Sequence, residues 1–292
     1  MSKQFFSAKK LIKLTNEDKC SIPTMVLKAE SELTGRTEDE IKKNMAQRLE
    51  LMRKSINFGL KGKKSLSGML YDEGKKMYEK INDKNMVGNK MILRAVSYAL
   101  SIMNCNASLG RIVAAPTAGS SGVLPGIIFA YLEEKKAPLD LGVEALLTAS
   151  GIGLIIANKA TFSAAKAGCQ AEIGVSSAMA ASALSYMRGM SVEQCVDSAG
   201  LALKNFLGLA CDPVAGLVEV PCAKRNAFAV SHAFMASDMV YAGIKSVIPF
   251  DEIVMAMNDV GRSMSTRIKE TAQCGLAMTK TGKKLKEKIF NK

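Results

Sequence analysis

Three long apolar stretches dominate the middle of the chain: 112–131, 139–158 and 170–188. Each comes near the hydrophobicity of a membrane span, which needs about twenty predominantly apolar residues. The first stretch, however, contains Pro116, Pro125 and several glycines, and the other two contain the carboxylates of Asp140, Glu144 and Glu172. Ionisable residues inside a membrane are energetically costly. We therefore predict that these stretches are buried helices of a soluble core, and we expect no membrane partner.

The rest of the sequence also favours helices. No run of alternating β-branched residues is long enough to predict a sheet. Aromatic residues make up only 5% and Trp is absent, whereas the small residues that allow close helix packing are plentiful. The segment TEDEIKKNMAQRLELM, 37–52, begins with a capping box formed by Thr37 and Glu40. Further helices are predicted at 91–104, 127–135, 140–158, 170–188, 191–207, 224–244, 251–260 and 262–272.

These patterns predict an all-α fold, or one nearly so, built as a single helical domain with long functional loops rich in glycine and proline. Residues 1–60 are predicted to form an N-terminal arm, with short elements up to residue 36, and the first helix. Residues 61–292 are predicted to form the main helical domain.

The formal net charge of +13 raises the question of nucleic-acid binding. The lysines, however, concentrate towards the two ends of the chain, and no aromatic-plus-basic recognition motif accompanies them. We therefore expect no nucleic-acid partner, and a solvated basic face or an acidic partner subunit explains the charge better. The N-terminal segment lacks the continuous apolar core of a signal peptide, and the seven cysteines are an odd number. Both features favour free thiols and a cytoplasmic location.

The segment CDPVAGLVEVPC, 211–222, begins and ends with a cysteine. In a helix, Cys211 and Cys222 would lie three turns apart on one face. Pro213 and Pro221 argue against that helix, because proline inside a helix loses a hydrogen bond and clashes with the preceding turn. The segment is therefore predicted to be an irregular loop that can bring its two thiols to one site. A third thiol, Cys169 in GCQAEIG, directly precedes a predicted helix.

Several kinds of chemistry compete for these cysteines. Structural zinc is poorly supported, because no CxxC pair occurs and His232 is the only histidine. An iron–sulfur cluster tolerates long loop spacings, whereas a buried cysteine can also be a small hydrophobic residue without a ligand. Cys105 and Cys195 lie within helical patterns and are predicted to be such core residues. His232 lies in a helical apolar pattern and is interpreted as a core or helix-surface residue, not as a general base.

The segment APTAGSSGVLP forms a second irregular loop. It lacks the lysine and the preceding strand of a nucleotide-binding P-loop. Its small residues let the backbone approach an anion closely, and Ser and Thr hydroxyls lie beside it. This combination suits a small carboxylate, such as that of an amino acid.

Five segments carry a resemblance to a known family. In chain order they are APTAGSSGVLPG, AGCQAEIGVSSAMAASAL, LGLACDPVAGLVEVPCAKRNA, GIKSVIPFDEIV and KETAQCGLAMTKTGKKL. Together they resemble the α chain of the iron–sulfur-dependent bacterial L-serine dehydratase, or L-serine ammonia-lyase. The resemblance extends over most of the chain and is strongest from about residue 110 onwards.

The resemblance implies a site and a reaction. It implies that a 4Fe–4S cluster is held by Cys169, Cys211 and Cys222 within a catalytic domain spanning 61–292. It implies that a loop lines the substrate region, and the residues of that loop are Thr117, Ala118, Gly119 and Ser120. Three protein ligands leave one iron open as a Lewis acid, so the implied activity is the deamination of L-serine to pyruvate and ammonia. An iron–sulfur redox or sensor protein, or a structural subunit with unliganded cysteines, stays an alternative.

The chain also departs from the family pattern. Nothing in it resembles the SSSHTxGP motif of the family's β part, so a separate β chain of L-serine dehydratase is the expected partner. The C-terminal cysteine tail of some members is absent, and Cys274 stands where the family usually has glycine. We interpret Cys274 as an incidental substitution. The sequence identifies no general base, which the β chain is expected to supply.

Overall fold

The computed structural model describes residues 2–291, which form α-helices joined by short 3₁₀ turns. The α-helices are α1 Ala8–Glu17, α2 Ile22–Thr34, α3 Glu38–Leu60, α4 Glu73–Glu79, α5 Lys90–Ala107, α6 Val123–Lys135, α7 Leu139–Lys159, α8 Ala164–Ala167, α9 Ile173–Met187, α10 Val192–Lys204, α11 Cys222–Tyr241, α12 Phe250–Ser263 and α13 Lys280–Phe290. The 3₁₀ turns are η1 Ala118–Ser120, η2 Cys169–Ala171, η3 Val214–Gly216, η4 Thr266–Ile268 and η5 Gly275–Met278. No strand occurs among the described residues, so the predicted all-α fold is confirmed.

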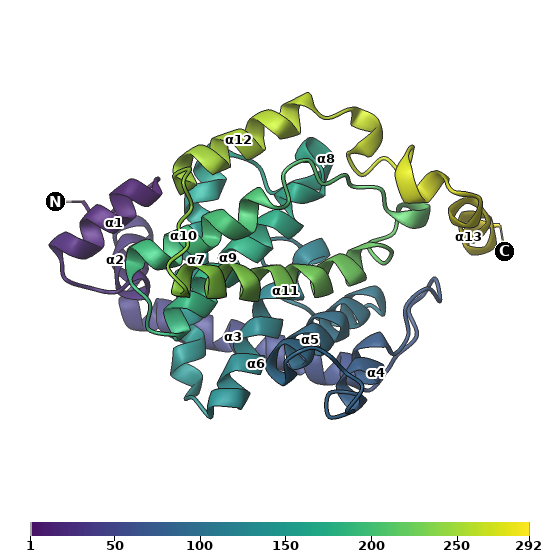
Figure 1. Cartoon of the computed structure of the whole chain (residues 1–292), viewed down its shortest axis with the longest axis horizontal. Coiled ribbons are helices and arrows are strands. Elements are labelled where there is room, and N and C mark those ends of the chain that lie inside the picture. The colour runs from purple at the N-terminus through teal and green to yellow at the C-terminus, as the bar shows by residue number, and fades with distance from the viewer. Residues whose placement is uncertain (1, 292) are drawn as a thin grey trace.

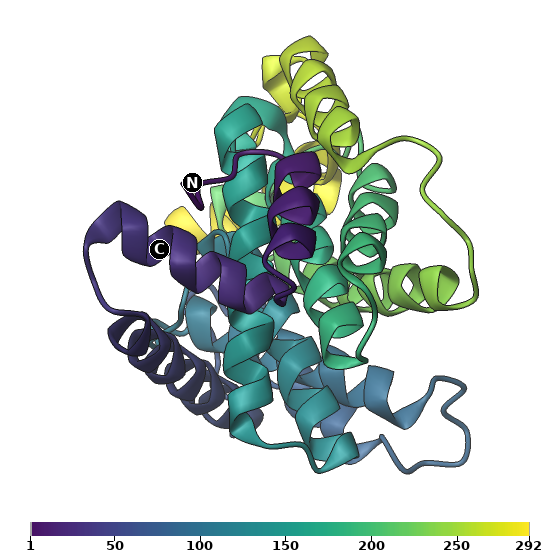
Figure 2. The same ribbon diagram turned by 90° about the vertical axis from the view of Figure 1, so that its left-hand side faces the viewer.

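The helices surround α9, which packs against α6, α7, α10 and α11 (Figure 1). Helix α9 consists almost entirely of small and apolar residues and is buried on nearly all sides, as expected for the central helix of a large core. Figure 1 shows α12 along the top and α13 at the right-hand end, beside the loop that leads into α11. In the turned view, α1 and α2 lie on the face nearest the viewer, across the long α7 (Figure 2).

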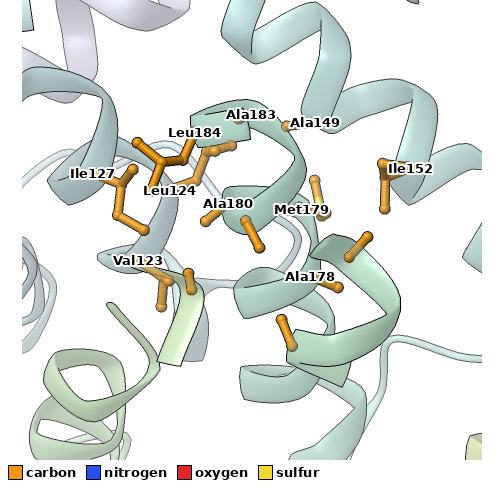
Figure 3. Close-up of a cluster of buried hydrophobic side chains, with 14 of the residues drawn as sticks. Val123, Leu124, Ile127, Ala149, Ile152, Ala178, Met179, Ala180, Ala183 and Leu184 are labelled. Atoms are coloured by element: carbon orange, nitrogen blue, oxygen red, sulfur yellow. The ribbon is translucent and has the colours of Figure 1, made fainter. Parts of the chain in front are cut away.

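Small residues set how closely the central helices approach. Side chains of α6, α7 and α9 interlock in the core, among them Ile127, Ile152 and Leu184 (Figure 3). At the start of α6, a β-carbon on Gly122 would lie 2.6 Å from the Ala99 carbonyl oxygen of α5. Only glycine permits this approach, which explains part of the high content of small residues in the apolar stretches.

Most predicted helices are confirmed within a few residues, including the capping box of Thr37 and Glu40 at the start of α3. The segment up to residue 36, predicted as short elements, forms two regular helices, α1 and α2. Helix α6 begins four residues before the predicted start. Pro125 falls in its first turn, where a missing amide hydrogen costs little, so the proline does not delay the helix.

The predicted helix at 262–272 is wrong. Helix α12 ends at Ser263, only the short turn η4 follows, and Glu270 and Ala272 take left-handed backbone angles, with φ of 64° and 53°. The backbone of this segment pairs instead with Cys211: the Cys211 amide donates to the Ile268 carbonyl at 2.8 Å, and the Glu270 amide donates to the Cys211 carbonyl at 2.9 Å. A long-range pairing thus overrides the local helical pattern.

Among the described residues, one helix, α7, is long and apolar enough to cross a membrane by length and composition alone. In its most apolar window, 67% of the residues are buried inside the protein. Helices α1 to α3 contribute to the same main hydrophobic core as the rest of the chain. The predicted division of the chain at residue 60 stays a prediction.

Candidate functional site

Three cysteines from separate parts of the chain lie close together in space, and we call them the cysteine site: Cys169, Cys211 and Cys222. Cys169 begins η2, Cys211 pairs with Lys269 in an isolated bridge, and Cys222 is the first residue of α11. All three are free thiols, and none is more than 8% exposed. The two other buried cysteines lie elsewhere, Cys105 in α5 and Cys195 in α10, as the sequence predicts.

The loop 211–222 is irregular, as predicted from its prolines. It folds back on itself because the Val214 amide donates to the Val220 carbonyl at 2.8 Å, around the short turn η3. This closure brings the two ends of the loop together. On the other side of the site, Gly168 has a φ of +73°, and a β-carbon there would lie 2.8 Å from the Leu209 carbonyl oxygen. Glycine at position 168 therefore lets the turn that carries Cys169 pack against the chain just before Cys211.

The three thiols influence one another's ionisation. A hydrogen bond from Cys211 lowers the pKa of Cys169, and the nearby Arg225 guanidinium lowers it further against the effect of burial. The same hydrogen bond, together with burial, raises the pKa of Cys211. Burial and the charge of Cys169 raise the pKa of Cys222 to about 12. Cys169 is therefore the thiol of the three that loses its proton most readily, and three thiolates would need a bound cation that displaces the protons.

A single metal ion does not fit these residues. Among residues 2–291, no three Cys, His, Asp or Glu side chains converge on one ion-sized position. This agrees with the weak sequence support for zinc. An iron–sulfur cluster differs, because each cysteine ligates its own iron and the sulfurs need not meet at a point. Three soft thiol donors from separate segments are consistent with such a cluster.

An ion pair between Arg225 and Asp212, next to the cysteine site, connects the segments that carry the cysteines. Arg225, one turn after Cys222 in α11, donates to Asp212 Oδ1 and to the Ala210 carbonyl, both at 2.8 Å. The second oxygen of Asp212 accepts the Leu276 amide at 2.8 Å. The side chains of Arg225 and Asp212 are 19% and 8% exposed, so this pair is shielded from water. It connects α11, the Cys211 segment and the C-terminal turn η5.

Asn226 connects the cysteine site to the small-residue loop 117–120. Its side-chain amide donates to the Gly119 carbonyl at 2.8 Å and to the Cys222 carbonyl at 2.9 Å, and its oxygen accepts the Gly122 amide at 3.0 Å. Asn226 is fully buried, so these three bonds satisfy most of its hydrogen-bonding capacity. The structure therefore places the predicted substrate loop beside the predicted cluster ligands.

The small-residue loop also contacts Glu172, which lies between η2 and α9. A β-carbon on Gly119 would lie 2.9 Å from Glu172 Oε2, so the loop and the carboxylate are in close contact. Burial raises the pKa of Glu172, and the nearby Thr117 hydroxyl only partly opposes that rise. Thr117 Oγ1 lies 3.1 Å from Ser120 Oγ, so two hydroxyls and a carboxylate line one side of the loop.

Sequence reasoning missed Glu172, Arg225 and Asn226 as parts of this site. Arg225 and Asn226 could have been found from the helix that begins at Cys222, because residues three and four positions apart lie on the same helix face. Glu172 follows Cys169 by three residues in the quoted segment GCQAE.

Other candidate residues lie apart from this arrangement. His232 is exposed on α11, with its ring 4.8 Å from that of Phe206, in keeping with a helix-surface residue. Cys274 is partly exposed just before η5. A cavity of about 460 Å³ is lined by Phe234, Asp238 and Tyr241, at the opposite end of α11 from Cys222.

Fold and site together define a helical protein whose buried three-cysteine site adjoins a loop of small and hydroxyl-bearing residues. The family model "Serine dehydratase alpha chain" matches residues 17–277, and the chain belongs to that family. It is 43% identical to the probable L-serine dehydratase alpha chain of Bacillus subtilis, over 98% of this chain and 95% of the relative. It is 41% identical to the L-serine dehydratase alpha chain of Peptoniphilus asaccharolyticus, over 96% of both chains. A longer relative, the L-serine dehydratase of Streptomyces coelicolor, is 33% identical over 94% of this chain but only 61% of its own length.

Proposed function

We propose that this chain is the α subunit of an iron–sulfur-dependent L-serine dehydratase, a lyase that converts L-serine to pyruvate and ammonia. Family membership and the names of the relatives support the substrate and the reaction. The observation that carries the proposal further is the meeting of Cys169, Cys211 and Cys222 beside the loop 117–120. Nothing in the local sequence requires these segments to meet, whereas a shared cofactor and substrate would.

In this proposal Cys169, Cys211 and Cys222 hold a 4Fe–4S cluster. With three protein ligands, the bound cluster supplies an iron with an open position that acts as a Lewis acid towards the hydroxyl group of serine. The Arg225 guanidinium lowers the pKa of Cys169 and would balance part of the negative charge of its sulfur. Neighbouring groups of this kind orient a ligating side chain and tune its donor strength.

The chain's own residues also prepare the substrate site. Asn226 fixes the loop 117–120 against the turn that carries Cys222, so that cofactor ligands and substrate loop keep their relative positions. The backbone of Ala118 and Gly119 and the hydroxyls of Thr117 and Ser120 are suited to the carboxylate of serine. The low exposure of the three cysteines limits water at the reacting groups.

A β chain completes the proposed enzyme. The Streptomyces coelicolor relative carries a large additional part that this chain does not match. A separate subunit would supply the corresponding part, including the general base. The net charge of +13 would suit an acidic partner. The expected cytoplasmic location, without a membrane or nucleic-acid partner, belongs to the same proposal.

The test is anaerobic purification of the chain with and without the β chain, followed by assays of iron, visible absorbance and pyruvate production. We expect iron–sulfur charge-transfer absorbance in the α chain alone and pyruvate from L-serine only after the β chain is added. A cluster with no pyruvate in the assembled complex would favour the redox or sensor alternative. Iron-free protein that still deaminates serine would refute the cluster.

A further inference from the structure

Glu172 is partly exposed, and it differs from the buried carboxylates Asp212 and Glu219 in how its charge is compensated. Asp212 is bound by Arg225 and by the Leu276 amide. Glu219, which is 5% exposed, accepts hydrogen bonds from two serine hydroxyls, at 2.7 and 2.6 Å. Within residues 2–291, the Glu172 carboxylate takes part in no ion pair, and the neighbouring Thr117 hydroxyl, which lowers its pKa against the effect of burial, lies within hydrogen-bonding distance of Ser120.

The neighbouring hydroxyls leave most of the Glu172 carboxylate free. The Thr117 hydroxyl lies 3.1 Å from that of Ser120, and a hydroxyl group donates one hydrogen only. The carboxylate oxygens of Glu172 therefore keep acceptor positions without a protein donor. Because the side chain is only partly exposed, a cation that reached these positions would bind a carboxylate shielded in part from water.

Among residues 2–291, no Lys, Arg or His side chain forms an ion pair with Glu172. Arg225 acts on the same site, but its donors are directed to Asp212 and to the Ala210 carbonyl. The Glu172 side chain does not cap its own helix either, since α9 has no side-chain hydrogen bond at its N-cap. The Glu172 carboxylate can therefore bind a cation that comes from outside the chain.

The position of Glu172 suits one cation in particular. The carboxylate lies close against Gly119, which has no side chain to hinder this approach, and its charge acts on both Cys169 and Cys222. It thus lies between the small-residue loop and the cysteine site. An α-amino acid carries its carboxylate and its ammonium on the same carbon, so the groups that bind them must be neighbours. The loop 117–120 suits the substrate carboxylate, and Glu172, which adjoins that loop, is placed to bind the neighbouring ammonium group.

We propose that Glu172 binds the α-ammonium group of the amino-acid substrate and thereby selects α-amino acids over acids that lack an amino group. The inference rests on the proposed function, in which the loop 117–120 binds the substrate carboxylate. Charge-assisted hydrogen bonds between an ammonium group and a buried carboxylate are among the stronger polar contacts in proteins.

The test compares L-alanine with propanoate, which differ only in the ammonium group and have no hydroxyl to lose. Both are titrated calorimetrically into the anaerobic, cluster-loaded enzyme assembled with its β chain. We expect the wild type to bind L-alanine at least about tenfold more tightly than propanoate, since a hydrogen bond between charged groups contributes about that factor. Glu172→Gln should reduce the preference to less than about threefold, mainly through weaker binding of L-alanine.

Two further variants make the result specific. Glu270→Gln removes an exposed carboxylate from the same neighbourhood and should keep the wild-type preference. Glu172→Asp keeps the charge and should keep part of the preference. Equal affinities of the wild type for both ligands, or an unchanged preference in Glu172→Gln, would overturn the proposal. Loss of iron from both Glu172 variants would overturn it as well, because Glu172 would then belong to the framework of the cysteine site.

Failure of the proposed function gives a different result. In that case the assembled wild-type enzyme would produce no pyruvate from L-serine, whatever its preference between L-alanine and propanoate. Failure of the Glu172 assignment alone would leave pyruvate production intact in the wild type.

Discussion

Two parts of the molecule hold a partly buried carboxylate between helices, and they compensate its charge in opposite ways. Where α12 meets the N-terminal helices, Asp251 accepts hydrogen bonds from Lys159 at 2.7 Å and from the Ala8 and Lys9 amides at 3.0 and 3.1 Å. Burial alone would raise the pKa of Asp251, but these donors outweigh it and hold the pKa below its ordinary value. Beside the cysteine site, burial raises the pKa of Glu172.

This difference indicates that Asp251 serves the packing of the helices, whereas Glu172 belongs to a binding site. The charge of Asp251 is compensated by Lys159 and two backbone amides without any ligand, so these contacts stabilise the fold. The cysteine site holds three thiols and a carboxylate that the chain itself compensates only in part, which is the arrangement expected where a cofactor and a substrate supply the missing partners. Substitutions in the two regions should therefore affect different measured quantities.

The largest effect is expected for the three cysteines of the cysteine site. Changing Cys169, Cys211 or Cys222 to serine should abolish cluster retention and serine deamination, because a hydroxyl is a poor ligand for iron–sulfur iron. Iron per chain after anaerobic reconstitution is the measurement. The matched controls are Cys105→Ser and Cys195→Ser, which alter equally buried thiols in α5 and α10 and should retain near-normal iron. A full cluster in Cys211→Ser would contradict the assignment.

The next largest effect is expected for Arg225. Arg225→Met leaves Asp212 as a buried charge with only the Leu276 amide, which should reduce the free energy of unfolding by about 3 kcal/mol. Chemical denaturation of the iron-free chain measures this loss, and reconstitution should also yield less iron per chain. Lys54→Met, which removes an exposed pair with Glu50 on α3, is the control and should change stability little. Equal losses in both variants would show that the pair beneath the cysteine site has no special role.

Two glycines three residues apart should separate stability from binding. In Gly122→Ala the new methyl group meets the Ala99 carbonyl oxygen in the core, and we expect a loss of about 2 kcal/mol in unfolding free energy. In Gly119→Ala it meets only the end of the flexible Glu172 side chain, which can move. Gly119→Ala should therefore unfold nearly like the wild type but bind L-alanine more weakly. The opposite ranking in unfolding would contradict the contrast between core and site.

The smallest effect is a pH dependence of opposite sign for the two carboxylates. A raised carboxyl pKa in the folded state contributes stability below the ordinary pKa of 4.5, and that stability is lost as pH rises through the raised value. Glu172→Gln should therefore stabilise the ligand-free chain at neutral pH and lose this advantage in acid. Asp251, with its lowered pKa, contributes stability above its ordinary value of 3.8, so Asp251→Asn should destabilise the chain at neutral pH. Melting temperatures of the two variants and the wild type across this pH range test both predictions. A stability change of the same sign in both variants at neutral pH would contradict the contrast between the two carboxylates.

Much of the fold could be predicted from the sequence, because helix formation depends on local patterns. The apolar periodicity, the capping box at Thr37 and the lack of β-branched alternation predicted the all-α fold and most helices within a few residues. The helix predicted at 262–272 failed for a reason that no local pattern contains. Its backbone groups pair with Cys211, more than fifty residues earlier in the chain.

For the site, the sequence by itself determined which thiols differ from ordinary core cysteines. Prolines exclude a helix between Cys211 and Cys222, and the helical setting of Cys105 and Cys195 marks them as packing residues. Only the tertiary structure decided what surrounds the three thiols. Arg225, Asn226 and Glu172 acquire their roles from contacts with residues far away in sequence. Their charge and hydrogen-bonding capacity can be read from the sequence, but whether a partner within the chain uses that capacity depends on how the helices pack.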